Sequence, residues 1–261
     1  EVRRFDAAWE RDASVRLRDG DLSALDDYER HGRLHGGTRE AMVSAAVDRY
    51  VAAVLSGRSA ALITATNDEA AEVSARVQER LLGPLSFDQP GETGGRGAPV
   101  GYGMDGNLVR VGDRIQWRVN TYDVPEGAEP LINREFLTVD SCTAQGVQLR
   151  RESDGSTVHV PREWLAERAQ LGYAGTEHAY EGVTVDEAHT LTPGYVAMTR
   201  GRHLNEAWLT TQEPGDEHGE QVQTTVREVF EARFSEEGRT TSALQAWSEE
   251  LDAERHAATM A

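Results

Sequence analysis

The residues best suited to chemistry lie between positions 172 and 210, in the sequence GYAGTEHAYEGVTVDEAHTLTPGYVAMTRGRHLNEAWLT. This segment brings hydroxyl, imidazole, carboxylate and guanidinium groups close together in the chain. The chain contains 27 arginines and no lysine. The planar, permanently charged guanidinium group of arginine is well suited to binding phosphate. A phosphate-binding loop of the form G-x-x-x-x-G-K-[ST] requires a lysine. The chain is therefore not a complete ATPase of that type.

The same segment spells DEAH at positions 186–189. Two carboxylates at the end of a buried strand can hold magnesium beside a nucleotide, as this signature does in helicases of superfamily 2. Such an enzyme also needs the lysine-bearing loop upstream and a serine/alanine/threonine motif downstream, and the sequence contains neither. We interpret the spelling as a coincidence and predict no metal site.

Composition limits the possible classes of protein. With 261 residues, 38% of them hydrophobic, the chain can bury a substantial core. Its single cysteine, Cys142, excludes a disulfide framework and multi-thiolate zinc sites, which favours a reducing compartment and a cytoplasmic location. No apolar run approaches the roughly 20 residues that cross a membrane. No membrane partner is expected.

The net charge of -18 opposes tight binding of a polyanion by this chain alone, because such binding depends on neutralising phosphates. The acidity is densest in the tail. Residues 213–261 hold 12 acidic residues against 4 arginines, which accounts for -8 of the total.

Hydrophobic periodicity predicts an α/β fold. A helix capped by Thr38 extends to Ser56, an apolar strand covers 60–66, and a second helix ends at Leu82, as in a layered domain with a parallel sheet. Glycine and proline mark a linker over 83–106. The following segments alternate, with Ile115, Trp117 and Val119 as the apolar positions of one of them. They predict a small antiparallel barrel or curled sheet of about five strands.

This organisation predicts a discontinuous domain. Residues 57–90 and 165–212 would form the α/β domain, and residues 100–164 the inserted β-domain. Residues 1–56 would form a helical segment that leads into the α/β domain. Residues 213–261 would form an acidic helical tail, with apolar positions at Val226, Val229 and Phe230 and then at Leu244, Trp247 and Leu251.

Two motifs resemble those of a known family. Residues 195–202, YVAMTRGR, resemble motif VI of superfamily 1 helicases, and residues 176–186 resemble their motif V, T-x-H-x-x-Q-G-x-T-x-D. Further segments, including LITATNDEAAEVSARV and GNLVRVGDRIQWRVN, follow the order seen in the helicase part of MobF-class, TraA/TrwC-like conjugative relaxases. The resemblance implies a second RecA-like domain with an inserted SH3-like β-domain, following a first RecA-like domain.

The family's site residues carry over position by position. Arg200 would be the arginine finger on the γ-phosphate, with Arg4 as a second γ-phosphate arginine. Glu181 and Gly182 would lie near the nucleotide. Single-stranded DNA would be contacted by Thr66, Asn67, Thr176 and His178. In the complete motor, ATP and Mg²⁺ are the cofactors, held mainly by a P-loop-bearing first motor domain.

The chain departs from the family pattern at two places. Glu181 stands where the family has glutamine, and a carboxylate near phosphates is repulsive. Only residues 190–194 join the two motifs, where the family has a longer segment. Three hypotheses follow: half of a motor that completes an ATP site in another domain, a degenerate binding module for nucleic acid or protein without catalysis, and an acidic inhibitor that mimics DNA.

Overall fold

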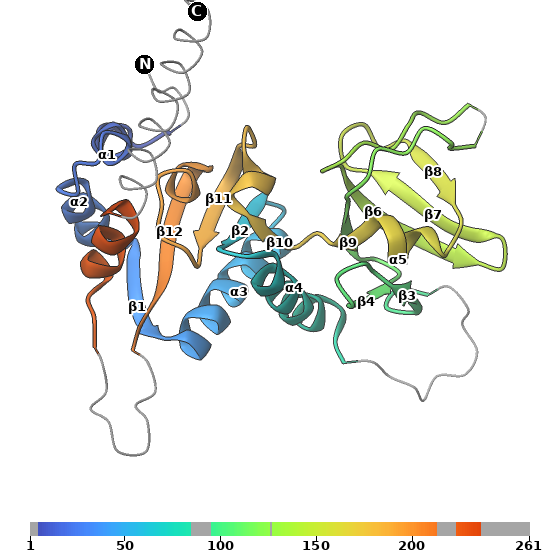
Figure 1. Ribbon diagram of the computed structural model, residues 1–261, viewed down its shortest axis with the longest axis horizontal. Coiled ribbons are helices and arrows are strands. Elements are labelled where there is room, and N and C mark those ends of the chain that lie inside the picture. The colour runs from blue at the N-terminus through green and yellow to red at the C-terminus, as the bar shows by residue number, and fades with distance from the viewer. Residues whose placement is uncertain (1–4, 85–94, 126, 213–222, 236–261) are drawn as a thin grey trace, which may run out of the picture.

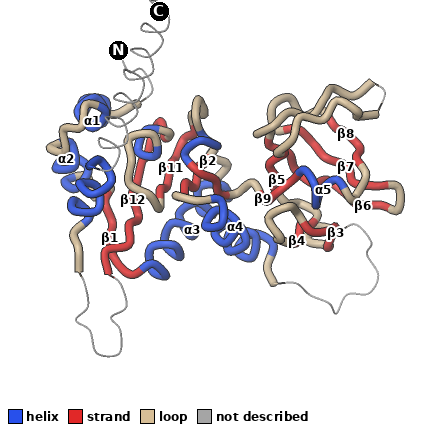
Figure 2. The backbone as a smooth tube through the Cα atoms, viewed as in Figure 1, coloured by secondary structure: helices blue, strands red, loops and turns tan. Residues whose placement is uncertain are grey.

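The computed structural model describes residues 5–84, 95–125, 127–212 and 223–235, and the chain forms two lobes (Figure 1). One lobe contains a five-stranded parallel sheet with helices. The other contains antiparallel strands and is inserted between α4 and β10 (Figure 2). The predicted α/β class with an inserted antiparallel domain is confirmed.

The parallel sheet has the strand order β1-β12-β11-β2-β10. All five residues of β2 are buried, which explains the uninterrupted apolar run in its sequence. The strands are β1 (Leu34–Thr38), β2 (Ala60–Thr64), β10 (Ala174–Thr176), β11 (Val185–Thr190) and β12 (Gly201–Gln212).

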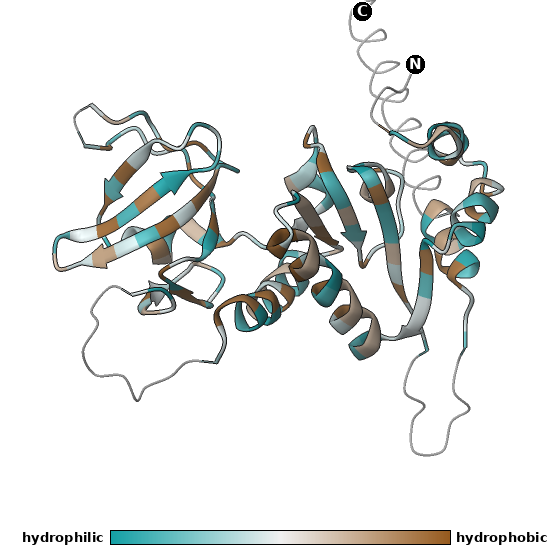
Figure 3. Ribbon diagram, turned by 180° about the vertical axis from the view of Figure 1, so that it is seen from behind, coloured by the Kyte–Doolittle hydropathy of each residue, from teal (hydrophilic) through white to brown (hydrophobic). Residues whose placement is uncertain are grey.

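Helices α3 (Arg39–Leu55) and α4 (Asn67–Leu82) pack on the sheet and on each other. Both begin at a threonine cap, since the Oγ1 atoms of Thr38 and Thr66 accept hydrogen bonds from backbone N–H groups three residues on. Val43, Val47 and Val73 are among the periodic apolar residues on their buried faces. Figure 3 shows hydrophobic and hydrophilic residues alternating along both helices. Both helices, with the strand between them, are confirmed as predicted.

The β-lobe holds a five-stranded antiparallel sheet in the order β8-β7-β6-β5-β9, together with the hairpin β3-β4. Ile115 and Trp117 are completely buried in its core, but Val119 is 42% exposed because β5 ends at Trp117. The prediction for Val119 was therefore wrong. The elements are β3 (Pro99–Tyr102), β4 (Leu108–Arg110), β5 (Arg114–Trp117), β6 (Phe136–Thr143), β7 (Gly146–Arg151), β8 (Thr157–Val160), α5 (Trp164–Arg168) and β9 (Ala169–Leu171).

Polar contacts join the two lobes along α4. The Gln78 Nε2 atom donates to the Leu108 carbonyl at 2.7 Å and to the Asp113 carboxylate at 2.6 Å. The Asn107 Nδ2 atom donates to the Ala71 carbonyl at 2.9 Å. Because Asp113 is buried, its pKa is raised to about 6. These bonds join the β-lobe to both halves of α4.

The boundaries differ from the predicted ones at two points. Residues 34–38, within the segment predicted to be helical, form the edge strand β1, in which Gly36 has no room for a side chain beside Thr211 and Val226. Residues 169–171 pair with β5, so the chain returns to the parallel sheet at Ala174 and not at 165. In both cases long-range pairing determines the strand, which local propensity does not reveal.

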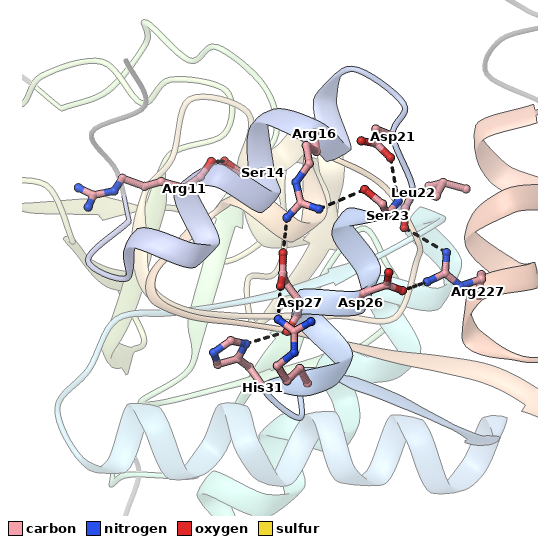
Figure 4. A network of polar contacts seen from close by, with 11 residues as sticks. Arg11, Ser14, Arg16, Asp21, Leu22, Ser23, Asp26, Asp27, His31 and Arg227 are labelled. Atoms are coloured by element: carbon pink, nitrogen blue, oxygen red, sulfur yellow. Dashed lines mark hydrogen bonds and ion pairs between the residues drawn. The ribbon is translucent and has the colours of Figure 1, made fainter.

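The chain ends of the described region meet beside β12. The helices α1 (Ala8–Arg18) and α2 (Ala24–Arg30) pack with the helix at 226–235, whose Phe230 is fully buried. Figure 4 shows Arg227 donating to the Leu22 carbonyl and pairing with Asp26. The predicted helix around Val226, Val229 and Phe230 is confirmed. Leu244, Trp247 and Leu251 lie outside the described residues, as does Arg4.

No helix in the described part of the chain is long and apolar enough to span a membrane.

Candidate functional site

A pocket of about 420 Å³ lies where the carboxyl ends of two parallel strands face the β-lobe. Ligand sites of open parallel sheets commonly lie at this edge. The lining residues come from the start of α4, from the end of β10 with the 3₁₀ turn η1 (Glu177–Tyr180), and from the β-lobe. They are Ala65, Thr66, Asn67, Gln116, Arg118, Arg134, Thr176, His178 and Ala179.

The α4 side of the pocket is built around a helix cap. The Thr66 Oγ1 atom accepts from the Glu69 N–H at 3.2 Å, and the Glu69 carboxylate accepts from the Ala65 N–H at 3.1 Å. Thr66 and Asn67 are both exposed. The amino end of this 16-residue helix carries partial positive charge, which favours a phosphate at this point.

The second side comes from β10, which is paired in parallel with β2. Thr176 stands opposite Thr64 in this register, so the turn after β10 lies beside the turn that leads into α4. Thr176 is half-buried and His178 is exposed. The register thus gathers all four residues assigned to DNA by resemblance, Thr66, Asn67, Thr176 and His178, in one pocket. Their role in DNA binding stays a prediction.

The β-lobe supplies the third side through Gln116, Arg118 and Arg134, which the sequence analysis did not identify as site residues. Gln116 and Arg118 flank the buried Trp117, and the alternating pattern of the sequence marks both as polar positions. The pattern does not show that their side chains line a pocket. Arg134 has a φ of 73°, in the left-handed region that non-glycine residues seldom adopt. Its N–H donates to the Trp117 carbonyl at 2.7 Å, which holds the turn in place.

The electrostatics of the pocket are opposite to those of the whole chain. The chain carries 45 acidic residues, yet none is among the described residues that line this pocket, which include two arginines and a histidine. Local charge controls contacts at short range because distant charges are screened beyond roughly 10 Å at moderate salt. The net charge of -18 therefore does not decide the charge that a ligand meets in this pocket, where the nearest carboxylates of α4 are Asp68 and Glu69 in its first turn.

The residues assigned to the nucleotide lie together elsewhere in the same lobe. Arg200 follows the 3₁₀ turn η2 (Ala197–Thr199) and is 7% exposed. Its guanidinium donates to the carbonyls of Val196 at 2.9 Å and Tyr180 at 3.3 Å, and Tyr180 precedes Glu181 and Gly182. The Arg200 Nη2 atom donates to the Thr199 hydroxyl at 3.1 Å, so the Arg200 side chain is hydrogen-bonded to its own lobe. Reaching a phosphate requires it to give up some of these bonds.

These three residues do not form a complete nucleotide site. Glu181 is exposed and acidic, and Gly182 has a φ of 78°, which favours glycine at this turn. Of these three residues, Arg200 is therefore the one whose side chain could donate to a phosphate.

The residues that spell DEAH serve the fold. The Asp186 Oδ2 atom accepts from the Ser59 N–H at 2.9 Å and from its hydroxyl at 2.8 Å. His189 is completely buried, with Nε2 3.6 Å from the Glu187 carboxylate and Nδ1 3.3 Å from that of Glu206. Among the described residues, no group of three or more His, Cys, Asp or Glu side chains is arranged to hold a metal ion.

This buried cluster predicts that stability depends on pH. Burial alone would lower the pKa of His189, but its contacts with Glu187 and Glu206 outweigh burial and raise it above 6.5. The protonated form therefore stabilises the fold below that pH, and the stabilisation is lost as pH rises through the folded pKa. We expect the free energy of unfolding, measured with urea, to fall as pH rises above 6.5 and through the folded pKa of His189, and His189→Gln to flatten the fall.

Glu10 is the necessary control for that experiment. Burial raises the pKa of Glu10 to about 7. The folded protein therefore binds a proton at Glu10 that the unfolded chain releases, so the free energy of unfolding also falls as pH rises from about 4.5 to 7. Arg33, His35, Arg49 and Arg58 also face the Glu187 and Glu206 carboxylates. A pH profile that changes in Glu10→Gln but not in His189→Gln contradicts the assignment to His189.

Sequence comparison finds two uncharacterized relatives, and no model of a known protein family matches the chain. Rv2311 of Mycobacterium tuberculosis strain H37Rv is 27% identical over 128 residues, which cover 46% of this chain and 73% of that protein. MT2373 of Mycobacterium tuberculosis strain CDC 1551 / Oshkosh matches with the same values.

The chain is also similar to solved structures of Pif1 proteins. Bacteroides Pif1 bound to ssDNA matches with a TM-score of 0.47 and 14% identity, over 79% of this chain and 50% of that one. Pif1 helicase from Candida albicans matches with a TM-score of 0.48 and 15% identity, over 78% and 55%. The chain thus spans about half the length of these structures.

Proposed function

We propose that this chain is part of a DNA-processing motor of the superfamily 1 helicase type and that its own contribution is a track for single-stranded DNA. The observation that carries the proposal is the pocket between α4, β10 and the β-lobe. It combines a helix amino end, two arginines and several hydrogen-bonding side chains without a lining carboxylate. Phosphates and exposed base edges are the ligands that such a set of groups binds.

A single strand suits this pocket better than a duplex. The polar groups lie inside a recess, whereas duplex readers insert a protruding helix or ribbon into a groove. A flexible strand can place a phosphate or an unstacked base into such a recess. The β-lobe, joined to α4 by the Gln78 and Asn107 bonds, would then act as a fixed wall of the track.

The ATP-driven part of the proposal requires a second domain. Because the chain has no lysine, a P-loop must come from elsewhere, either on the same polypeptide or in trans. ATP and Mg²⁺ supply the reactive phosphoryl group and charge neutralisation when bound there. Arg200 would contribute its guanidinium to that site. The resemblance of the quoted segments to conjugative relaxases extends the proposal to a role in DNA transfer in the cytoplasm.

A degenerate binding module is the second candidate. The replacement of glutamine by Glu181 and the short joint at 190–194 favour it, since both remove features that the family uses near the nucleotide. In that case the pocket would bind nucleic acid without any coupling to ATP. Both candidate functions use the same single-strand track. They differ in whether Arg200 contributes to an ATP site.

A binding measurement tests the track. We expect a labelled 12-nucleotide oligothymidylate to bind in fluorescence anisotropy more tightly than a blunt duplex of equal length. If Arg118 and Arg134 contact two phosphates, the logarithm of affinity falls with the logarithm of salt concentration with a slope of about -1.4. Equal affinity for the duplex, or no binding at low salt, refutes the proposal.

A further inference from the structure

The strongest unassigned feature of the pocket is the side chain of Gln116. It lies on β5, which is paired on one side with β6 and on the other with β9, and it is 2% exposed. Its Nε2 atom is buried and has no hydrogen-bond partner within the described part of the protein. A buried donor without a partner bears an uncompensated desolvation cost, so it calls for a ligand.

The orientation of the Gln116 amide is determined by its neighbour. The Arg118 Nη1 atom donates to the Gln116 Oε1 atom at 3.4 Å. A guanidinium group has donors only, so the amide oxygen must face Arg118 and the amide nitrogen must point away from it. Gln116 also lines the pocket, so a shift of its side chain is enough to bring the buried, unpartnered N–H group to a bound molecule.

A neutral amide at the most buried position differs from the groups at the rim. Thr66, His178 and Arg134 are exposed, and together with the amino end of α4 they offer charge or partial charge to a phosphate. Bringing the phosphate down to Gln116 would desolvate an anion for a single neutral donor. The edge of a nucleobase is neutral and carries acceptor atoms that a single strand leaves accessible.

We propose that Gln116 donates a hydrogen bond to a carbonyl acceptor of one unstacked nucleobase and makes the track base-selective at that position. The inference rests on the proposed single-strand site. It assigns the phosphate contacts to the rim and the base contact to the floor of the pocket. Thymine, cytosine and guanine present a carbonyl oxygen, and adenine does not.

The test combines a protein variant with a base analogue. An oligothymidylate is compared with strands in which one thymine at a time is replaced by difluorotoluene, which keeps the shape of thymine but is a much weaker acceptor. For the unaltered chain we expect affinity to fall about three- to tenfold at one position only. Gln116→Met should lower affinity for the all-thymine strand by a similar factor and remove the difference between the strands.

Controls separate this inference from the proposed function. Gln148→Met, on β7 of the same sheet and outside the pocket, should leave both affinities unchanged. The analogue scan on the unaltered chain needs no substitution, so it decides the matter even if Gln116→Met does not fold. Equal loss on both strands in Gln116→Met, or no position-dependent loss in the scan, overturns the inference. Failure of the unaltered chain to bind any strand refutes the single-strand site itself.

Discussion

Purified alone, the chain is expected to hydrolyse ATP no faster than a buffer blank, and Arg200→Ala should abolish the activity that a cognate P-loop domain restores. The physical reason is that phosphoryl transfer spreads negative charge over the equatorial oxygens. An arginine finger stabilises this charge by a factor of about 10³ to 10⁵ in rate. The measurement is magnesium-dependent ATPase turnover of an equimolar mixture with saturating single-stranded DNA.

The internal bonds of Arg200 require a careful control. Removing a guanidinium that donates to the Val196 and Tyr180 carbonyls leaves two backbone acceptors without these partners, so thermal unfolding must be compared first. Arg202→Ala is the matched variant, because Arg202 is exposed and two residues further along. If the P-loop domain restores ATPase turnover and this turnover is unchanged in Arg200→Ala, Arg200 is not the arginine finger. If the P-loop domain does not restore turnover at all, the result favours a binding module without catalysis.

The sequence predicted those elements whose signals are local. Helices α3 and α4 were predictable because a threonine cap precedes each and their apolar residues recur at helical spacing. The strand β1 was not, since Gly36 and Gly37 lower strand propensity and only the packing of Thr211, Val226 and Met42 explains them. The assignment of local elements thus succeeded, and the edge strand β1, which depends on pairing with the distant β12, was missed.

The sequence predicted the residues that the α/β lobe contributes to the candidate site but not those that the β-lobe contributes. Thr66 and Thr176 follow two strands that a parallel sheet places side by side, so their proximity was implicit in the fold class. The contribution of Arg118 and Arg134 depends on how the β-lobe is fixed to α4 by Gln78 and Asn107, which no local pattern encodes. Sequence reasoning therefore found two sides of the pocket and missed the third, which the β-lobe supplies.

Reversing both arginines of the β-lobe is expected to abolish single-strand binding. Hydrogen bonds to charged groups contribute about 1.5–3 kcal/mol each, so Arg118→Glu with Arg134→Glu should weaken binding of oligothymidylate by about 100-fold or more. Fluorescence anisotropy at several salt concentrations measures it. The control pair Arg80→Glu with Arg150→Glu makes the same change in net charge on exposed ion-paired arginines outside the pocket. Comparable losses in both pairs would show that only overall charge matters.

The backbone of Arg134 allows a sharper form of this prediction. A left-handed residue with a Cβ atom is strained by roughly 1–2 kcal/mol, and glycine relieves that strain. Because Arg134 has a φ of 73°, Arg134→Gly should leave the free energy of unfolding unchanged or higher while single-strand affinity falls. If Arg134→Gly raises the free energy of unfolding while it lowers single-strand affinity, the strained backbone of Arg134 serves ligand binding and not stability. A variant that loses stability and keeps its affinity would instead make Arg134 a structural residue of the turn.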